Sequence, residues 1–196
     1  MNNFKRNIAR WTRWLHIYLS MFSFAALLFF SLTGITLNHT SWIEGRQITE
    51  QIEGQLNPVW VKQNAGKPDK LEVVEYLRDE YHITAKLSEF RIEESECSVS
   101  FAGPGYTADG FIDRATGHYK MTITKSGFIA MMNDLHKGRD TSPAWTLLID
   151  VSAVLIILVS LTGFSMIFFL NKKRLGGLIT TIVGVLVILF VYFLFV

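Results

Sequence analysis

Long apolar runs alternate with segments of mixed polarity along the chain. Three runs contain no charged side chain: residues 17–37, 151–170 and 175–196. Each has about the 20 residues that an α-helix needs to cross the ~30 Å hydrocarbon core of a bilayer. We therefore expect three transmembrane helices, with boundaries at residues 15–38, 146–170 and 175–196.

The segment between the first two apolar runs has the pattern of a small soluble domain. Apolar positions at helical spacing predict a helix over residues 71–81, and a second, amphipathic helix is expected over 126–135. Runs that end in turn residues predict four strands: residues 87–92, 97–101, 106–112 and 118–124. The fold class is then an α-helical membrane protein in which a small α+β domain, residues 39–145, is inserted between the first and second transmembrane helices.

The distribution of charge predicts the orientation. The seven charged side chains in residues 1–16 and in the link 171–174 are all basic, whereas residues 40–145 hold 12 basic and 16 acidic ones. Short segments rich in Lys and Arg stay in the cytoplasm, so residues 1–14 and 171–174 are expected there and the inserted domain and the C-terminus on the other side. The formal net charge of +2 gives no indication of nucleic-acid binding. The first apolar run is too long for a cleaved signal peptide and predicts an uncleaved anchor.

Short motifs flank the apolar runs. They are R-W-L-H at 13–16, S-L-T-G at 31–34 and again at 160–163, D-x-x-T-G-x-hydrophobic at 113–119, and L-H-K-G at 135–138. The hairpin motif resembles a PepSY-type domain, and the whole set, in this order, resembles the PepSY-associated transmembrane family over essentially the whole chain. That family includes ferric-siderophore reductases that carry b-type haem. Its small members resemble membrane partners of periplasmic flavin-bearing electron-transfer proteins. The resemblance implies a multi-pass protein of the bacterial inner membrane with a periplasmic domain.

Three of the five histidines, His16, His39 and His136, lie at membrane boundaries. An ionisable residue at membrane depth usually marks a function, although a half-polar ring is also comfortable at the interface. His39 and His136 flank the inserted domain and would lie near the same outer surface if the first two helices pack together. Two imidazoles suit the iron of a haem, and iron with both axial positions filled transfers electrons rather than binding oxygen. A zinc site would need a third or fourth ligand, for which Asp140 is a candidate.

The repeated S-L-T-G string adds Gly34 and Gly163. Glycine in a membrane helix allows another helix, or a flat ligand, to approach closely. The simplest interpretation is helix packing. The alternative is that Gly34 lines a haem at the level of His39 and His136, and Gly163 a second haem at the level of His16. His16 would then need a second ligand, from the partner in a homodimer or from a residue other than histidine.

Other residues carry weaker signals. Arg139 lies where a haem propionate would emerge, but basic residues at membrane edges are common. Asp150, about one turn into the second helix, could orient an axial histidine or pair with a base. The single Cys97 excludes an intrachain disulfide and is expected to be a small buried residue. His82 and His118 are expected to be surface or structural residues.

Two functions remain open on the sequence. The first is an oxidoreductase-type electron-transfer protein that holds one or two haem b groups, contacts membrane lipid, and passes electrons toward a periplasmic partner, a flavoprotein or a ferric chelate. Any flavin would be on the partner, because the chain has no flavin or nucleotide fingerprint. The second is a PepSY binding or regulatory module acting on a peptidase or another protein, with the helices as an anchor and no haem. A protease has little support, since neither a nucleophile elbow nor H-E-x-x-H occurs.

Overall fold

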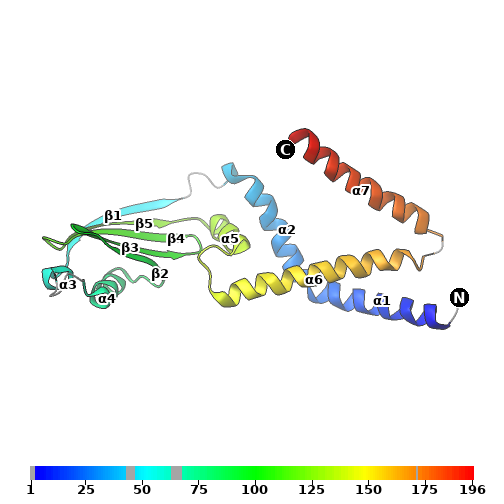
Figure 1. Cartoon of the computed structure of the whole chain (residues 1–196), viewed down its shortest axis with the longest axis horizontal. Coiled ribbons are helices and arrows are strands. Elements are labelled where there is room, and N and C mark those ends of the chain that lie inside the picture. The colour runs from blue at the N-terminus through cyan, green and yellow to red at the C-terminus, as the bar shows by residue number, and fades with distance from the viewer. Residues whose placement is uncertain (1–2, 43–46, 63–67, 171) are drawn as a thin grey trace. The chain divides into compact units, whose positions relative to one another are not determined.

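The computed structural model describes residues 3–42, 47–62, 68–170 and 172–196. It divides into two compact units, residues 1–29 with 150–196 and residues 30–149, and Figure 1 traces the elements of both. Residues 1–2 of the expected cytoplasmic segment and Asn171 of the expected link lie outside the described residues.

Long apolar helices make the chain a membrane protein. In the described ranges, α6 (Pro143–Ile167) and α7 (Arg174–Phe195) are each long and apolar enough to span a bilayer. The segments α1 (Asn3–Phe22) and α2 (Phe24–Asn38) meet that test only as a pair, bent by 58°. The spanning helices are therefore two, or three if the bent pair is a single span. Their apolar side chains are largely exposed, as contact with lipid requires.

The bend lies at Ser23, inside the segment expected to be one helix over residues 15–38. The Ser23 hydroxyl donates a hydrogen bond to the Leu19 carbonyl one turn earlier, an arrangement that often bends helices. The two halves also differ in character, because α1 is amphipathic and α2 is apolar all round. Helix α1 begins at Asn3, so most of the expected N-terminal segment 1–14 is helical.

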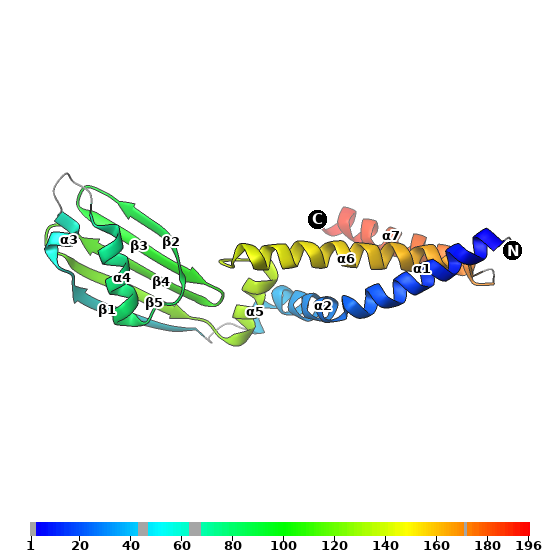
Figure 2. The ribbon, with the colours of Figure 1, turned by 90° about the horizontal axis from the view of Figure 1, so that it is seen from below.

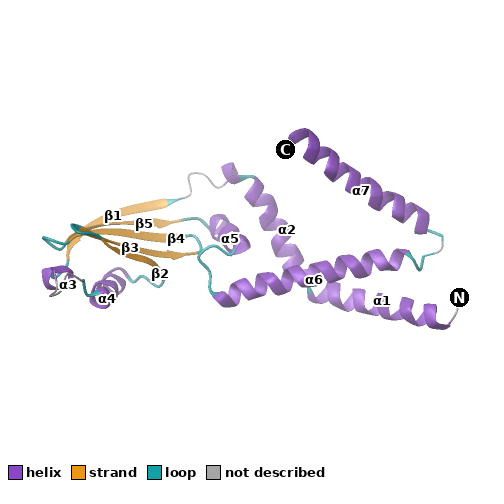
Figure 3. Ribbon diagram, viewed as in Figure 1, coloured by secondary structure: helices purple, strands orange, loops and turns teal. Residues whose placement is uncertain are grey.

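The inserted domain is built on a five-stranded antiparallel sheet in the order β1-β5-β4-β3-β2 (Figure 3). The strands are β1 (Ile48–Gln55), β2 (Lys86–Ile92), β3 (Glu96–Gly103), β4 (Tyr106–Asp113) and β5 (His118–Lys125). The four strands predicted from the sequence are confirmed. Strand β1 and the short helix α3 (Pro58–Lys62) were not predicted, since β1 is an exposed edge strand in which polar residues hide the alternation.

Helix α4 (Lys70–Tyr81) lies across one face of this sheet (Figures 1 and 2). The Asp69 carboxylate caps its first turn by accepting from the backbone of Leu71 and Glu72. Buried Val73 and Leu77 pack in the core cluster with alternate residues of the strands. Those are Cys97, Val99 and Phe101 from β3, Ala108 and Ile112 from β4, and Tyr119, Met121 and Ile123 from β5. Cys97 is fully buried, as expected, and burial raises the pKa of its thiol.

The turn that joins β4 to β5 depends on Gly117. Its φ is +79°, and a Cβ there would lie 2.7 Å from the Leu56 carbonyl oxygen. We expect Gly117→Ala to lower the free energy of unfolding by about 2 kcal/mol, because positive φ costs an L-residue roughly 1–2 kcal/mol before any clash. Gly103→Ala is the matched control, since its nearest neighbour, Ala85 Cβ, is at an ordinary 3.7 Å. Denaturant unfolding of the two variants checks this, and equal stabilities would contradict it.

Candidate histidine site

The structure pairs two boundary histidines with the two S-L-T-G strings. His136 is on α5 (Phe128–Lys137), where the chain leaves the sheet, and its Nδ1 lies 2.6 Å from the Thr33 hydroxyl of the first string. Its Cε1 is the atom that a Cβ on Gly34 would meet, at 3.8 Å. The ring also makes an edge contact with Phe30, with ring centroids 5.1 Å apart. The imidazole is thus held by consecutive small residues on one face of α2.

A second polar contact lies beside the first on the same two helices. The Thr36 hydroxyl donates to Asn133 Oδ1 at 2.6 Å, and Asn133 is only 6% exposed. Thr33 and Thr36 are three residues apart on α2, and so are Asn133 and His136 on α5, so each pair shares a helix face. Buried polar groups need such partners. The two hydrogen bonds therefore fix how α5 meets α2.

The second string repeats this arrangement with His16. Its Nδ1 lies 3.0 Å from the Thr162 hydroxyl, and its Cε1 lies 3.0 Å from where a Cβ on Gly163 would be. Thr162 donates its hydroxyl proton to the Leu158 carbonyl of its own helix at 2.8 Å. Because the hydroxyl has a single proton, its oxygen is left to accept from Nδ1–H of His16. A larger residue than glycine at position 163 would press against the imidazole.

His39 has the same proton placement but a different setting. Its Nδ1–H donates to the Ile35 carbonyl at 2.9 Å, and its exposed ring stacks on Trp42 at 4.3 Å. In the described part of the chain, none of the three boundary histidines makes a hydrogen bond through Nε2. His118, in the sheet, instead directs Nε2 toward Glu53 at 3.8 Å. A histidine that is bonded through Nδ1 can offer Nε2 to a metal.

The environment of His136 favours the neutral ring. Burial, with a smaller effect from the neighbouring Lys137 ammonium, lowers the pKa of His136. A neutral imidazole keeps a lone pair on one ring nitrogen, which a metal ligand needs. At neutral pH His136 can therefore serve as a ligand without first losing a proton.

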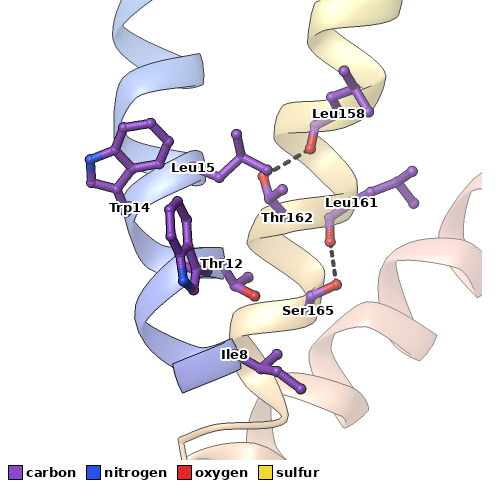
Figure 4. A pocket seen from close by; sticks show the side chains of 9 residues that line it. Ile8, Thr12, Trp14, Leu15, Leu158, Leu161, Thr162 and Ser165 are labelled. Atoms are coloured by element: carbon purple, nitrogen blue, oxygen red, sulfur yellow. Dashed lines mark hydrogen bonds between the residues drawn. The ribbon is translucent and has the colours of Figure 1, made fainter. Parts of the chain in front are cut away.

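An apolar groove lies beside the His16 pair. It has a volume of ≈ 440 Å³ and is bordered by Thr162 itself. Figure 4 shows α1 and α6 running alongside each other there, with Leu15 and Thr162 between them. Trp11 and Trp14 line its α1 side, and Leu158 and Leu161 its α6 side.

The expected site residues fall into two groups. Gly34 and Gly163 each lie against a histidine, His136 and His16 respectively. His39 contacts its own segment, and Arg139 lies 4.0 Å from Asp134 as an ion pair at the end of α5. Asp140 is exposed, and among the described residues no three His, Cys, Asp or Glu side chains form a metal-binding group, which leaves the zinc alternative without a ligand set. Asp150 is exposed on α6.

The sequence had not indicated Thr33, Thr162 or Asn133. Both threonines belong to the repeated string, of which only the glycines were singled out. A threonine precedes the glycine in each copy, within a largely apolar helix, and this repetition could have indicated a role for the hydroxyl.

These features define a class: an α-helical membrane protein with an inserted PepSY-like α+β domain and paired histidine–threonine contacts at its apolar helices. A family model described as PepSY_TM-like matches residues 10–196. The chain belongs to this PepSY-associated transmembrane family. No curated protein and no solved structure matches it.

Proposed function

We propose that this protein carries b-type haem in the bacterial inner membrane and passes electrons toward a periplasmic acceptor, a flavoprotein or a ferric chelate. The observation that carries the proposal is a contact shared by His16, His39 and His136: each is bonded through Nδ1, and none makes a hydrogen bond through Nε2 among the described residues. A membrane anchor has no need of this arrangement. It is the orientation that ligating histidines adopt when an outer partner holds the other nitrogen.

The residues present fit a haem group. Nε2 of His136 and of His16 would supply axial ligands, with His39 as the further candidate, and Gly34 and Gly163 leave room for the two imidazoles that lie against them. When bound, haem supplies a one-electron couple whose potential depends on its axial ligands and their hydrogen bonds. Thr33 and Thr162 hold the ring orientation of the two ligands. Arg139 remains a candidate partner for a propionate.

The same proposal includes the orientation of the chain in the membrane. Basic residues in 1–16 and at Lys172, Lys173 and Arg174 favour the cytoplasm for those segments, which puts the inserted domain and the C-terminus in the periplasm. No histidine follows His136 in the sequence. A second ligand for a haem at His16 would come from the partner in a homodimer or from a residue other than histidine.

Haem content tests the proposal directly. The full chain is expressed with added haem precursor, purified in neutral detergent and assayed for haem per chain. At least one haem per chain is the expected result. A protein that is folded, as judged by its circular dichroism, yet contains no haem would contradict the proposal. It would favour the second function, a PepSY module on a membrane anchor.

The Thr162 hydroxyl gives a finer prediction. Thr162→Val removes the acceptor for Nδ1–H of His16, so that the imidazole donates less electron density and the reduction potential rises. We expect a rise of roughly 20–60 mV, the equivalent of one hydrogen bond of net 0.5–1.5 kcal/mol. Thr162→Ser should keep the native potential. Thr180→Val is the control, because among the described residues that hydroxyl bonds only the Gly176 carbonyl of its own helix. A potential that stays the same in Thr162→Val, measured by spectroelectrochemical titration, would contradict this role.

A further inference from the structure

One face of α1 carries a row of arginines that have no acidic partner among the described residues. Arg6, Arg10 and Arg13 recur at intervals of four and three residues, so they lie on the same side of the helix. The sequence contains no Asp or Glu before residue 44. Three guanidinium groups therefore share one face without a counter-charge from their own segment.

These arginines border a groove. Together with Ala9, Trp14 and Ile17 they line a space of ≈ 390 Å³ on α1. Ala9 is small and buried between the long side chains. Guanidinium groups bind phosphate oxygens through paired N–H donors, so the groove offers a phosphate several donors above an apolar floor.

Apolar space continues on the other side of Trp14. The same indole borders the ≈ 440 Å³ groove between α1 and α6, whose further walls include Leu15, Leu158 and Leu161 (Figure 4). Trp14 is also in contact with Tyr18, with ring centroids 4.9 Å apart. Tryptophan and tyrosine prefer the level of the lipid headgroups. Trp14 thus borders both a charged groove and an apolar groove, which lie on different faces of α1.

We propose that α1 binds an anionic phospholipid. The phosphate lies against Arg6, Arg10 and Arg13, and an acyl chain occupies the groove between α1 and α6. Charge complementarity favours this occupant: guanidinium groups without an acidic partner among the described residues offer donors to an anion, and the apolar groove accommodates a hydrocarbon chain. Since Thr162 borders that groove and bonds His16, the lipid lies beside the His16 pair. The proposal does not depend on haem.

The test uses the purified full chain in neutral detergent and native mass spectrometry. Phosphatidylglycerol and phosphatidylcholine with identical acyl chains are added separately. We expect phosphatidylglycerol to bind at least about 10-fold more tightly, since each basic residue near an anionic lipid contributes measurably to binding. Equal affinity for the two lipids would overturn the proposal. Full displacement by inorganic phosphate would also overturn it, because the site would then recognise a free anion.

Matched variants separate a specific site from general charge. Arg10→Gln/Arg13→Gln should lose about 10-fold in affinity for phosphatidylglycerol, while Lys172→Gln/Lys173→Gln, with the same change in net charge, should keep it. Equal losses in both double variants would show a non-specific charge effect and refute the site. Ala9→Leu fills the floor of the groove at constant charge and should also weaken binding. The circular dichroism and elution volume of Ala9→Leu verify that this variant folds. If the folded variant binds phosphatidylglycerol as tightly as the native chain, the groove is not the binding site.

Discussion

On the proposed function, the double variant His16→Ala/His136→Ala is expected to purify with more than ~10-fold less haem per chain than the native protein, because loss of even an outer partner of a ligand typically costs 10–100-fold in affinity. Both imidazoles lie against S-L-T-G strings and keep Nε2 open. The double variant keeps the threonines and the glycines but lacks the two Nε2 atoms that are proposed to bind haem. Haem per chain, measured after alkaline pyridine extraction, checks the prediction.

The matched control is His82→Ala/His118→Ala, which removes the same number of imidazoles. His82 ends α4 in a left-handed conformation, and His118 faces Glu53 in the sheet. Haem content in this control should equal that of the native chain. If the His16/His136 double variant retains its haem, the two histidines are not the ligands and the proposed sites are wrong.

Phe101→Ala should lower the free energy of unfolding of the inserted domain by about 3–5 kcal/mol, the usual cost of truncating a buried phenylalanine. Phe101 is among the largest fully buried side chains, in the centre of β3 and within the cluster that includes Leu77 of α4. The guanidinium carbon of Arg78 lies 5.7 Å from the centre of its ring. The variant loses both the packing and this contact.

Phe111→Ala provides the comparison for the same chemical change. Phe111 is on the neighbouring strand β4 and is 56% exposed, so its truncation should cost less than about 1 kcal/mol. Unfolding in denaturant is followed by tryptophan fluorescence, to which Trp60, packed against the core, contributes with the four other tryptophans. Similar losses in the two variants would contradict the assignment of Phe101 to the core of the domain.

Much of this fold could be predicted from the sequence because it depends on local patterns. Residues 97–101 alternate in burial along β3 as they alternate in polarity, and the turn before β5 is marked by Asp113 and Gly117. Strand β1 was missed, since as an exposed edge it has little apolar alternation and takes its position from pairing with β5. The bend at Ser23 was missed because the sequence does not show that the Ser23 hydroxyl bonds the Leu19 carbonyl.

The candidate site was predicted only in part for a different reason. Histidines at membrane boundaries are visible as types and positions, so His16, His39 and His136 could be named. The partners of His16 and His136 are far away in sequence: Thr33 meets His136 across 103 positions, and His16 meets Thr162 across 146. No spacing rule links such residues. Only the packing of the helices shows that His16 and His136 each contact the threonine of one S-L-T-G string.

A reduced-minus-oxidised absorption spectrum of the purified full chain tests most directly the proposal that these histidines hold a redox-active haem. We expect a Soret band and a sharp visible band on reduction, typical of six-coordinate b-type haem, which reverse on reoxidation. A folded protein from cells with ample haem that shows no Soret absorption in either state would contradict it.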